Sequence, residues 1–114
     1  MLYFLLLHTY FLDTYRYLDI DFIDIDSDGD QDLFIGSSSG KLHYYNNIGT
    51  STNFNFELVT DSYFDIDIGS RSSPDFIDID SDNDYDLILG SYNQNLDIFR
   101  NIGDSSNPDF LFGI

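Results

Sequence analysis

One acidic segment occurs twice in this chain, and it constrains the fold more than any other feature of the sequence. Residues 24–32 read DIDSDGDQD, and residues 78–86, which lie 54 positions later, read DIDSDNDYD. Each copy places five aspartates at alternate positions. Two carboxylates about 4 Å apart repel each other by about 1 kcal/mol even in water, and by more when they are partly buried. A cation bound among them would remove this repulsion and cross-link the loop.

The duplication extends well beyond the acidic segments. Residues 21–60 align with residues 75–114 without a gap, and half of the aligned positions are identical. The two units are therefore an internal repeat. Short runs of apolar, β-branched and aromatic residues, separated by turn residues, predict four strands in each unit. In the first unit the expected strands are 22–25, 32–36, 41–45 and 56–60, with turns at 38–40 and 46–49.

The pattern favours an all-β fold, because no stretch of the chain keeps a helical period of 3.6 residues. Repeated units of four short antiparallel strands are typical of propeller blades. We therefore expect two four-stranded antiparallel blades of a β-propeller. Propellers contain about four to eight blades, so two blades form an incomplete ring. We expect further blades to come from the parent chain or from other copies.

The repeat divides the chain into four parts. We assign residues 1–19 to the remnant of a preceding blade or a linker, residues 20–60 to the first repeat, 61–74 to an inter-blade linker and 75–114 to the second repeat. The apolar start lacks the basic residues and cleavage site of a signal peptide and is too short to span a bilayer as a helix. A degenerate signal segment is the alternative. Within the linker, residues 64–68 alternate and predict an edge strand.

The charge of the chain is concentrated in the two acidic segments. The formal net charge is −17, Glu57 is the only glutamate, and ten of the twenty aspartates lie in these segments. Aspartate favours turns and caps over helix interiors. Such a charge argues against a nucleic acid or an anionic membrane as partner, and we expect no membrane insertion. The chain has no cysteine, which excludes disulfides and thiolate metal sites.

The spacing of the aspartates predicts one calcium ion per repeat. Calcium takes six to eight oxygen ligands, and carboxylates at positions 1, 3 and 5 of a tight loop point toward one centre. Position 7 would offer its backbone carbonyl and position 9 a further carboxylate. Gly29 permits the sharp turn in the first loop, and Asn83, which tolerates positive φ, replaces it in the second. The predicted metal residues are Asp24, Asp26, Asp28, Asp30 and Asp32 in the first loop and Asp78, Asp80, Asp82, Asp84 and Asp86 in the second.

Other interpretations of the loops are weaker. An EF-hand needs a bidentate glutamate at position 12 between two helices, but that position holds Ile35 and Leu89, and the flanks are predicted strands. Zinc is disfavoured because cysteine is absent and both histidines lie outside the loops. Thrombospondin-like calcium repeats pack their loops more densely and use cysteines. Magnesium, and acidic turns that hold no metal, are the alternatives.

The acidic loop between two strands, together with the runs FIDIDSDGDQDLFIGSSSGKLHYYNNIG and DIDIGSRSSPDFIDIDSDNDYDLILG, resembles the FG-GAP/VCBS repeats of integrin-α-like β-propellers. The likeness covers about residues 20–114. It implies that each loop joins the first two strands of a blade and binds a structural calcium. It also implies an extracellular or cell-surface protein that serves adhesion or carbohydrate recognition.

We therefore expect a non-catalytic calcium-binding module that recognises a protein or a glycan. The alternative is an accessory part of a secreted polysaccharide-active enzyme whose catalytic residues lie outside this chain. No arrangement of nucleophile, base and orienting acid can be proposed from the spacing. The aromatic residues Tyr44, Tyr45, Tyr92 and Phe99 are expected to pack between blades, and His43 to lie at the surface. Arg71 and Tyr92 are weak ligand candidates at the end opposite the loops.

Overall fold

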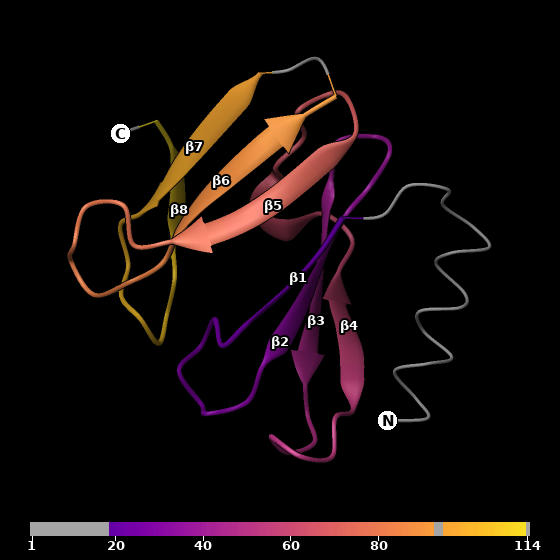
Figure 1. Cartoon of the computed structure of the whole chain (residues 1–114), viewed down its shortest axis with the longest axis vertical. Coiled ribbons are helices and arrows are strands. Elements are labelled where there is room, and N and C mark those ends of the chain that lie inside the picture. The colour runs from indigo at the N-terminus through magenta and orange to yellow at the C-terminus, as the bar shows by residue number, and fades with distance from the viewer. Residues whose placement is uncertain (1–18, 93–94, 114) are drawn as a thin grey trace.

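The chain forms two four-stranded antiparallel sheets (Figure 1), as the sequence predicts. The computed structural model describes residues 19–92 and 95–113. In both sheets each strand pairs with the next one along the chain. The first sheet contains β1 (Asp19–Ile23), β2 (Asp32–Gly36), β3 (Leu42–Asn47) and β4 (Phe56–Thr60), and the second contains β5 (Ser72–Ile77), β6 (Asp86–Ser91), β7 (Leu96–Asn101) and β8 (Phe110–Phe112).

The two sheets repeat the same register. Phe22 pairs with Leu33 in the first sheet, and Phe76 pairs with Leu87 at the aligned position of the second. Directly paired residues of antiparallel strands project to the same face of the sheet. The internal repeat therefore gives the two blades equivalent faces, which can be compared residue by residue.

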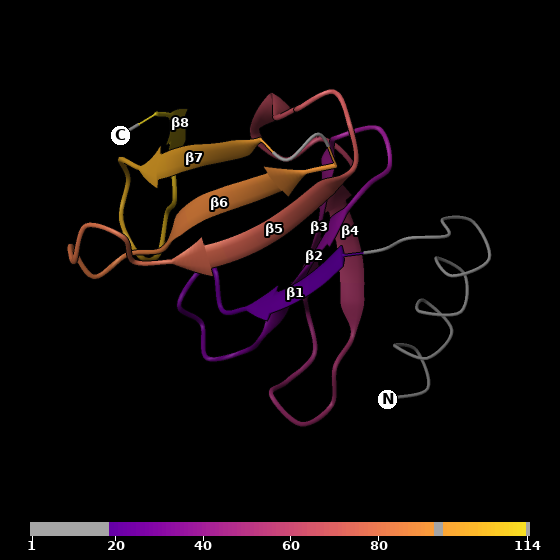
Figure 2. The same cartoon turned by 45° about the horizontal axis from the view of Figure 1, so that its top comes forward.

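The blades pack face to face, with β1 and β5 lying side by side (Figures 1 and 2). One face of the first blade and the opposite face of the second share a single apolar core. The rings of Phe34 and Phe76 meet across it, with centroids 4.6 Å apart. The first blade contributes Ile23, Ile25, Phe34 and Leu42 to this core, and the second contributes Phe76, Leu87, Leu89, Phe99 and Phe110.

A close backbone contact joins the blades at the end of β2. A Cβ atom added to Gly36 would clash with the carbonyl oxygen of Ser72. The buried Ser72 donates its N–H to the carbonyl of Ser37 over 3.1 Å and its hydroxyl to the carbonyl of Lys41 over 2.9 Å. The position of Gly36 requires glycine because only a residue without a side chain permits this approach.

The predicted edge strand at residues 64–68 is wrong. Tyr63–Asp65 form a 3-10 turn. Phe64 and Asp65 have φ angles of 50° and 53°, and β-strands do not adopt positive φ angles. The buried Tyr63 ring packs against Phe34, with centroids 5.0 Å apart. This packing draws the chain into the inter-blade core and overrides the alternating pattern. Within this segment only Asp67 takes part in a β-bridge, which pairs its backbone with that of Lys41.

Strand boundaries also differ from the sequence prediction. The predicted linker at 61–74 runs into β5, which already begins at Ser72 and includes Pro74. Proline is acceptable there because β5 is an edge strand of its sheet. The first strand covers Asp19–Ile23 instead of 22–25. The predicted remnant of a preceding blade, residues 1–19, lies outside the described residues except for Asp19. Among the described residues, no helix is long and apolar enough to cross a membrane.

Candidate metal centres

Both acidic segments form loops between the first and second strands of their blades. The first loop joins β1 to β2 and the second joins β5 to β6. Ser27 of the first loop donates its hydroxyl to the carbonyl of Ser105, in the connection between β7 and β8, over 2.8 Å. The first metal loop therefore contacts the second blade directly.

Two residues of each loop adopt a left-handed backbone. In the first loop these are Ser27, with φ of 59°, and Gly29, with φ of 92°. In the second loop Ser81 has φ of 61° and Asn83 has φ of 72°. The positive φ predicted for Asn83 is thus confirmed. The two serines were not predicted, because serine is not among the residues that favour this region.

The first aspartate of each loop holds the turn together. The two carboxylate oxygens of Asp24 accept the N–H groups of Asp28 and Gly29 over 3.1 and 2.9 Å. Asp78 accepts those of Asp82 and Asn83 over 3.1 and 3.0 Å. These bonds fold each loop around the carboxylates at its third and fifth positions. The loop is therefore shaped by one member of its own acidic set.

The last aspartate of each loop is fully buried and ties the loop to the sheet. Asp32 accepts the N–H of Ile25 over 3.2 Å and that of Asn47, in β3, over 3.0 Å. Asp86 accepts the N–H of Ile79 over 3.0 Å and that of Asn101, in β7, over 2.8 Å. Each carboxylate oxygen has a lone pair to spare beyond these bonds. The same group can therefore anchor the loop and face a cation.

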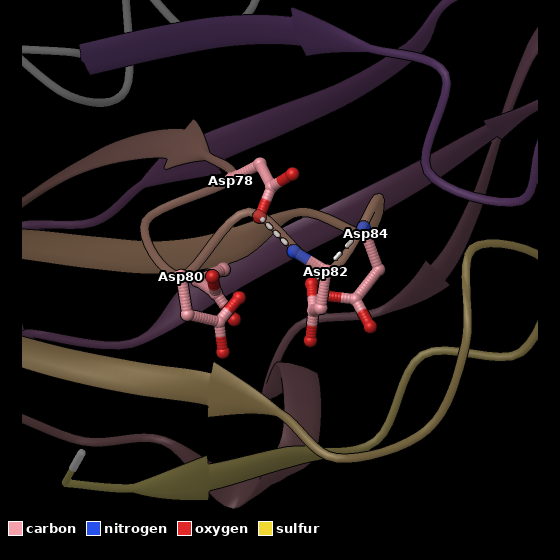
Figure 3. Close-up of side chains that lie close together, drawn as sticks. Asp78, Asp80, Asp82 and Asp84 are labelled. Atoms are coloured by element: carbon pink, nitrogen blue, oxygen red, sulfur yellow. Dashed lines mark hydrogen bonds between the residues drawn. The ribbon is translucent and has the colours of Figure 1, made fainter.

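Nine of the ten predicted metal residues converge in two groups. Within each group, one carboxylate oxygen from each residue lies within 4.8 Å of those of the other residues. The groups are Asp24, Asp26, Asp28 and Asp32 in the first loop and Asp78, Asp80, Asp82, Asp84 and Asp86 in the second. Figure 3 shows four residues of the second group, with the N–H groups of Asp82 and Asp84 donating to Asp78 and Asp82. The carboxylate of Asp30 is outside its group.

Crowding perturbs the acidity of these groups. Burial, followed by hydrogen bonding and repulsion from Asp28, raises the pKa of Asp26 to about 6. Burial also raises the pKa of Asp32 to about 7. In the second loop, burial and the adjacent Asp82 raise the pKa of Asp84 to about 7. Without a cation, these carboxylates reduce their mutual repulsion by binding protons, which is why their pKa values are raised.

One oxygen of the second loop indicates that this site suits a cation. Asp84 is only 7% exposed, and its Oδ1 atom is buried without a hydrogen-bond partner among the described residues. A buried carboxylate oxygen without a partner is costly. The atom belongs to a residue of the convergent group, so a bound cation would satisfy it. The donor set is purely oxygen, which suits calcium or magnesium and not zinc.

Sequence reasoning missed a polar support beneath each site. The Asn47 side chain accepts the N–H groups of Gly49 and Asn55 over 2.9 and 3.1 Å and donates to the carbonyl of Thr50 over 3.1 Å. Asn101 makes the same three contacts in the second blade. The backbone N–H of each asparagine binds the buried loop aspartate. The repeated NIG triplet was the signal that could have revealed this support.

The remaining candidates fall into two groups. Tyr44 and Phe99 pack in the inter-blade core, as predicted. Tyr45 is buried, but in a separate cluster on the other face of the first blade, and Tyr92 is exposed. Its N–H donates to the carbonyl of Arg71 over 3.1 Å, and Arg71 pairs with Asp19, with Nε and Oδ2 3.4 Å apart. His43 is half-buried, and burial lowers its pKa. Arg71 and Tyr92 therefore lie together, away from the acidic loops.

The fold and the loops define a class of repeat proteins whose blades each carry an acidic loop between their first two strands. The sequence model of the family described as FG-GAP-like repeat matches residues 24–89, which is more than half of the chain. The chain belongs to this family, which confirms the resemblance. No curated protein and no solved structure matches the chain.

Proposed function

We propose that this chain is a non-catalytic calcium-binding module of the β-propeller type, in which each blade holds one structural calcium ion. The observation that carries the proposal is the convergence of carboxylates in both loops at the same place in the repeat. The buried, unpartnered oxygen of Asp84 among the described residues supports it independently. The proposal keeps the ten predicted metal residues; Asp30 would contribute its backbone carbonyl, as expected for position 7, whereas Asp84 would contribute its carboxylate.

Calcium fits these loops better than magnesium does. Four or five carboxylates can supply more oxygens than the six positions of a strict octahedron, and magnesium usually retains several waters. Calcium tolerates irregular geometry and higher coordination. The loops supply both carboxylates and carbonyls from a few consecutive residues, so an irregular arrangement is expected.

The ion would act by stabilising the fold. If each site has a dissociation constant of ~0.1 mM and free calcium is about 1 mM, binding contributes about 1.4 kcal/mol per site. Domains of this size have marginal stability overall. The family membership supports a role outside the cell or at its surface, in adhesion or in recognition of a protein or glycan, where sites of this assumed affinity would be occupied by millimolar calcium.

The experiment that tests the proposal is calcium titration of the metal-free chain by isothermal calorimetry. We expect two sites and retention of binding in excess magnesium. Asp80→Asn should remove the second site and leave the first. Asp109→Asn, which changes an exposed aspartate outside both loops, should leave both. Absence of binding up to about 10 mM calcium, which is about tenfold above the dissociation constant of the weakest extracellular sites, would contradict the proposal.

A further inference from the structure

A cavity of about 440 Å³ lies between the connection from β4 to β5 (residues 61–71) and the last two strands of the second blade. Four phenylalanine rings line it, one from the connection, one from β7 and two from β8: Phe64, Phe99, Phe110 and Phe112. Its volume falls in the range of ligand pockets, about 300–1,000 Å³. The cavity is separate from both acidic loops, so the proposed calcium sites make no use of it.

The four rings form two steeply inclined pairs. Phe64 and Phe110 have centroids 5.5 Å apart and planes at 90°, and Phe99 and Phe112 have centroids 5.2 Å apart and planes at 66°. Rings in such pairs form adjoining walls and are not stacked face against face. Phe99 and Phe110 are each 8% exposed, whereas Phe64 is 43% and Phe112 is 64% exposed. Two rings therefore form the floor of the cavity and two form its rim.

Three carboxylates line the same cavity. Asp65 and Asp67 belong to the connection, and Asp97 belongs to β7. Within residues 19–92 and 95–113, none of the three forms an ion pair. This holds even for Asp67 and Lys41, whose backbones form a bridge. Aromatic walls combined with negative charge that no basic side chain balances favour a cation as ligand.

The backbone is strained where the connection enters the cavity. Phe64 and Asp65 have φ angles of 50° and 53°. Bulky residues rarely adopt this region, and strain of this kind is concentrated at functional sites. The ring of Phe64 packs against Tyr63 and Phe110, which holds the conformation in place. The two strained residues supply one ring and one carboxylate of the cavity.

The internal repeat shows that this combination of residues is particular to the second blade. The first blade carries His43 and Leu58 at the positions where the second carries Asp97 and Phe112. The first blade therefore lacks one carboxylate and one ring of the set. Residues that serve only to build a blade are expected in both copies. The difference indicates that the cavity has a role beyond the architecture of the blade.

We propose that this cavity binds the side chain of an arginine from a partner protein. A guanidinium group is planar and weakly hydrated, stacks on aromatic rings and offers five N–H donors to carboxylates. It can contact a ring and a carboxylate together, whereas the ammonium group of lysine is compact and strongly hydrated. An arginine within a peptide also brings an apolar stem and a backbone that cover the exposed rings of Phe64 and Phe112. A free small cation would leave these rings in water.

Titration of the full chain with the peptide acetyl-Ala-Arg-Ala-amide, followed by NMR of the phenylalanine rings, tests this proposal. Excess calcium keeps the blades folded, and ~0.15 M salt screens the general attraction of a cation to a chain of net charge −17. We expect the ring resonances to shift with a dissociation constant on the order of 1 mM, because a single side chain makes few contacts. Absence of shifts at about 20 mM peptide, about twentyfold above this constant, would overturn the proposal.

Three related ligands test the chemistry of the occupant. The peptide with citrulline in place of arginine keeps the shape without the charge and should bind at least about tenfold more weakly. The lysine peptide and propylguanidinium should each bind at least about threefold more weakly. Equal binding of the citrulline peptide would exclude a cation site, equal binding of the lysine peptide would exclude selection of arginine, and equal binding of propylguanidinium would exclude a peptide-borne ligand.

Two variants test the ring and the charge separately. Phe112→Leu introduces the residue that the first blade carries and keeps apolar surface, yet should weaken binding of the arginine peptide at least about threefold by removing a π face. Asp97→Asn should weaken it by a similar factor because it removes a carboxylate from the cavity. Circular dichroism melts establish that both variants are folded.

The matched controls are Leu111→Ala and Asp109→Asn, which change exposed residues next to β8 residues of the cavity but outside its lining. Both should bind the arginine peptide like the parent chain. Equal losses in the controls and in the cavity variants would overturn the proposal, because they would show a general effect of charge or surface. Calcium titration should give two sites in Phe112→Leu as in the parent, so failure of this proposal is distinguishable from failure of the calcium proposal.

Discussion

The buried carboxylate of Asp86 accepts the backbone N–H of Asn101 over 2.8 Å, and so joins the second metal loop to a strand that is not its neighbour in sequence. The same bond joins Asp32 to Asn47 in the first blade. These residues have two separable roles, one in the sheet and one toward a cation. Substitutions can distinguish the two.

Asp86→Asn should destabilise the chain even in the absence of calcium. The amide would present a donor to one of two backbone N–H groups, and a buried unsatisfied donor costs about 1–3 kcal/mol. Asp80→Asn changes an exposed member of the same group and should lower stability only when calcium is present. Urea denaturation of both variants in chelator and in calcium measures the difference. Equal losses for both variants in chelator would contradict the two roles.

The effect of calcium on the melting temperature should grow between pH 5 and pH 8. The raised pKa values of Asp26, Asp32 and Asp84, about 6 to 7, mean that the metal-free folded chain binds protons that the unfolded chain releases near pH 4. Stability without calcium is therefore highest at low pH and falls as the pH rises through this window. Calcium binding requires the deprotonated groups and strengthens over the same window. Circular dichroism melts in calcium and in chelator at each pH give both trends, and a constant difference between them would contradict the prediction.

Asn83→Ala should cost about 1 kcal/mol, because alanine in the left-handed region is strained. Asn83 has φ of 72°, and Asn83→Gly should change stability by less than about 0.5 kcal/mol, since glycine adopts this angle freely but loses more entropy on folding. Chemical denaturation in chelator isolates the backbone effect from metal binding. A larger loss for glycine than for alanine would show that the side chain, and not the backbone angle, determines this position.

Gly36→Ala and Gly90→Ala form a matched pair across the repeat. The first places a methyl group against the backbone of Ser72 and should cost at least about 2 kcal/mol, because backbone cannot yield as a side chain can. The second meets open space and should leave the stability of the monomer within about 0.5 kcal/mol. Thermal melts at low concentration compare them, and equal effects would be inconsistent with the inter-blade contact described above.

The sequence predicted the parts of this structure that depend on local pattern. The repeat, the strand-flanked loops and the positive φ of Asn83 follow from residue type and spacing alone. The convergence of Asp24, Asp26, Asp28 and Asp32 also follows, because alternate positions of a tight turn point inward. These features need no information about distant contacts.

The errors arise where the two blades meet. The ring of Tyr63 packs against Phe34 in the core that the two blades share, and this contact replaces the strand predicted at residues 64–68 by a turn. Tyr92 is exposed although its pattern resembles that of core aromatics. The hydrogen bonds that anchor Asp32 to β3 and Asp86 to β7 could not be predicted from the sequence either. All three depend on residues brought together only by the fold.

The Ser27–Ser105 hydrogen bond has a mechanical consequence. It joins the blades at the end that carries the acidic loops, while Ser72 joins them at the other end through Ser37 and Lys41. Two sheets fixed at both ends of their contact cannot open about either end as a hinge. A force that separates the blades must break both attachments and the core between them together, so the pair should resist tension as one rigid unit.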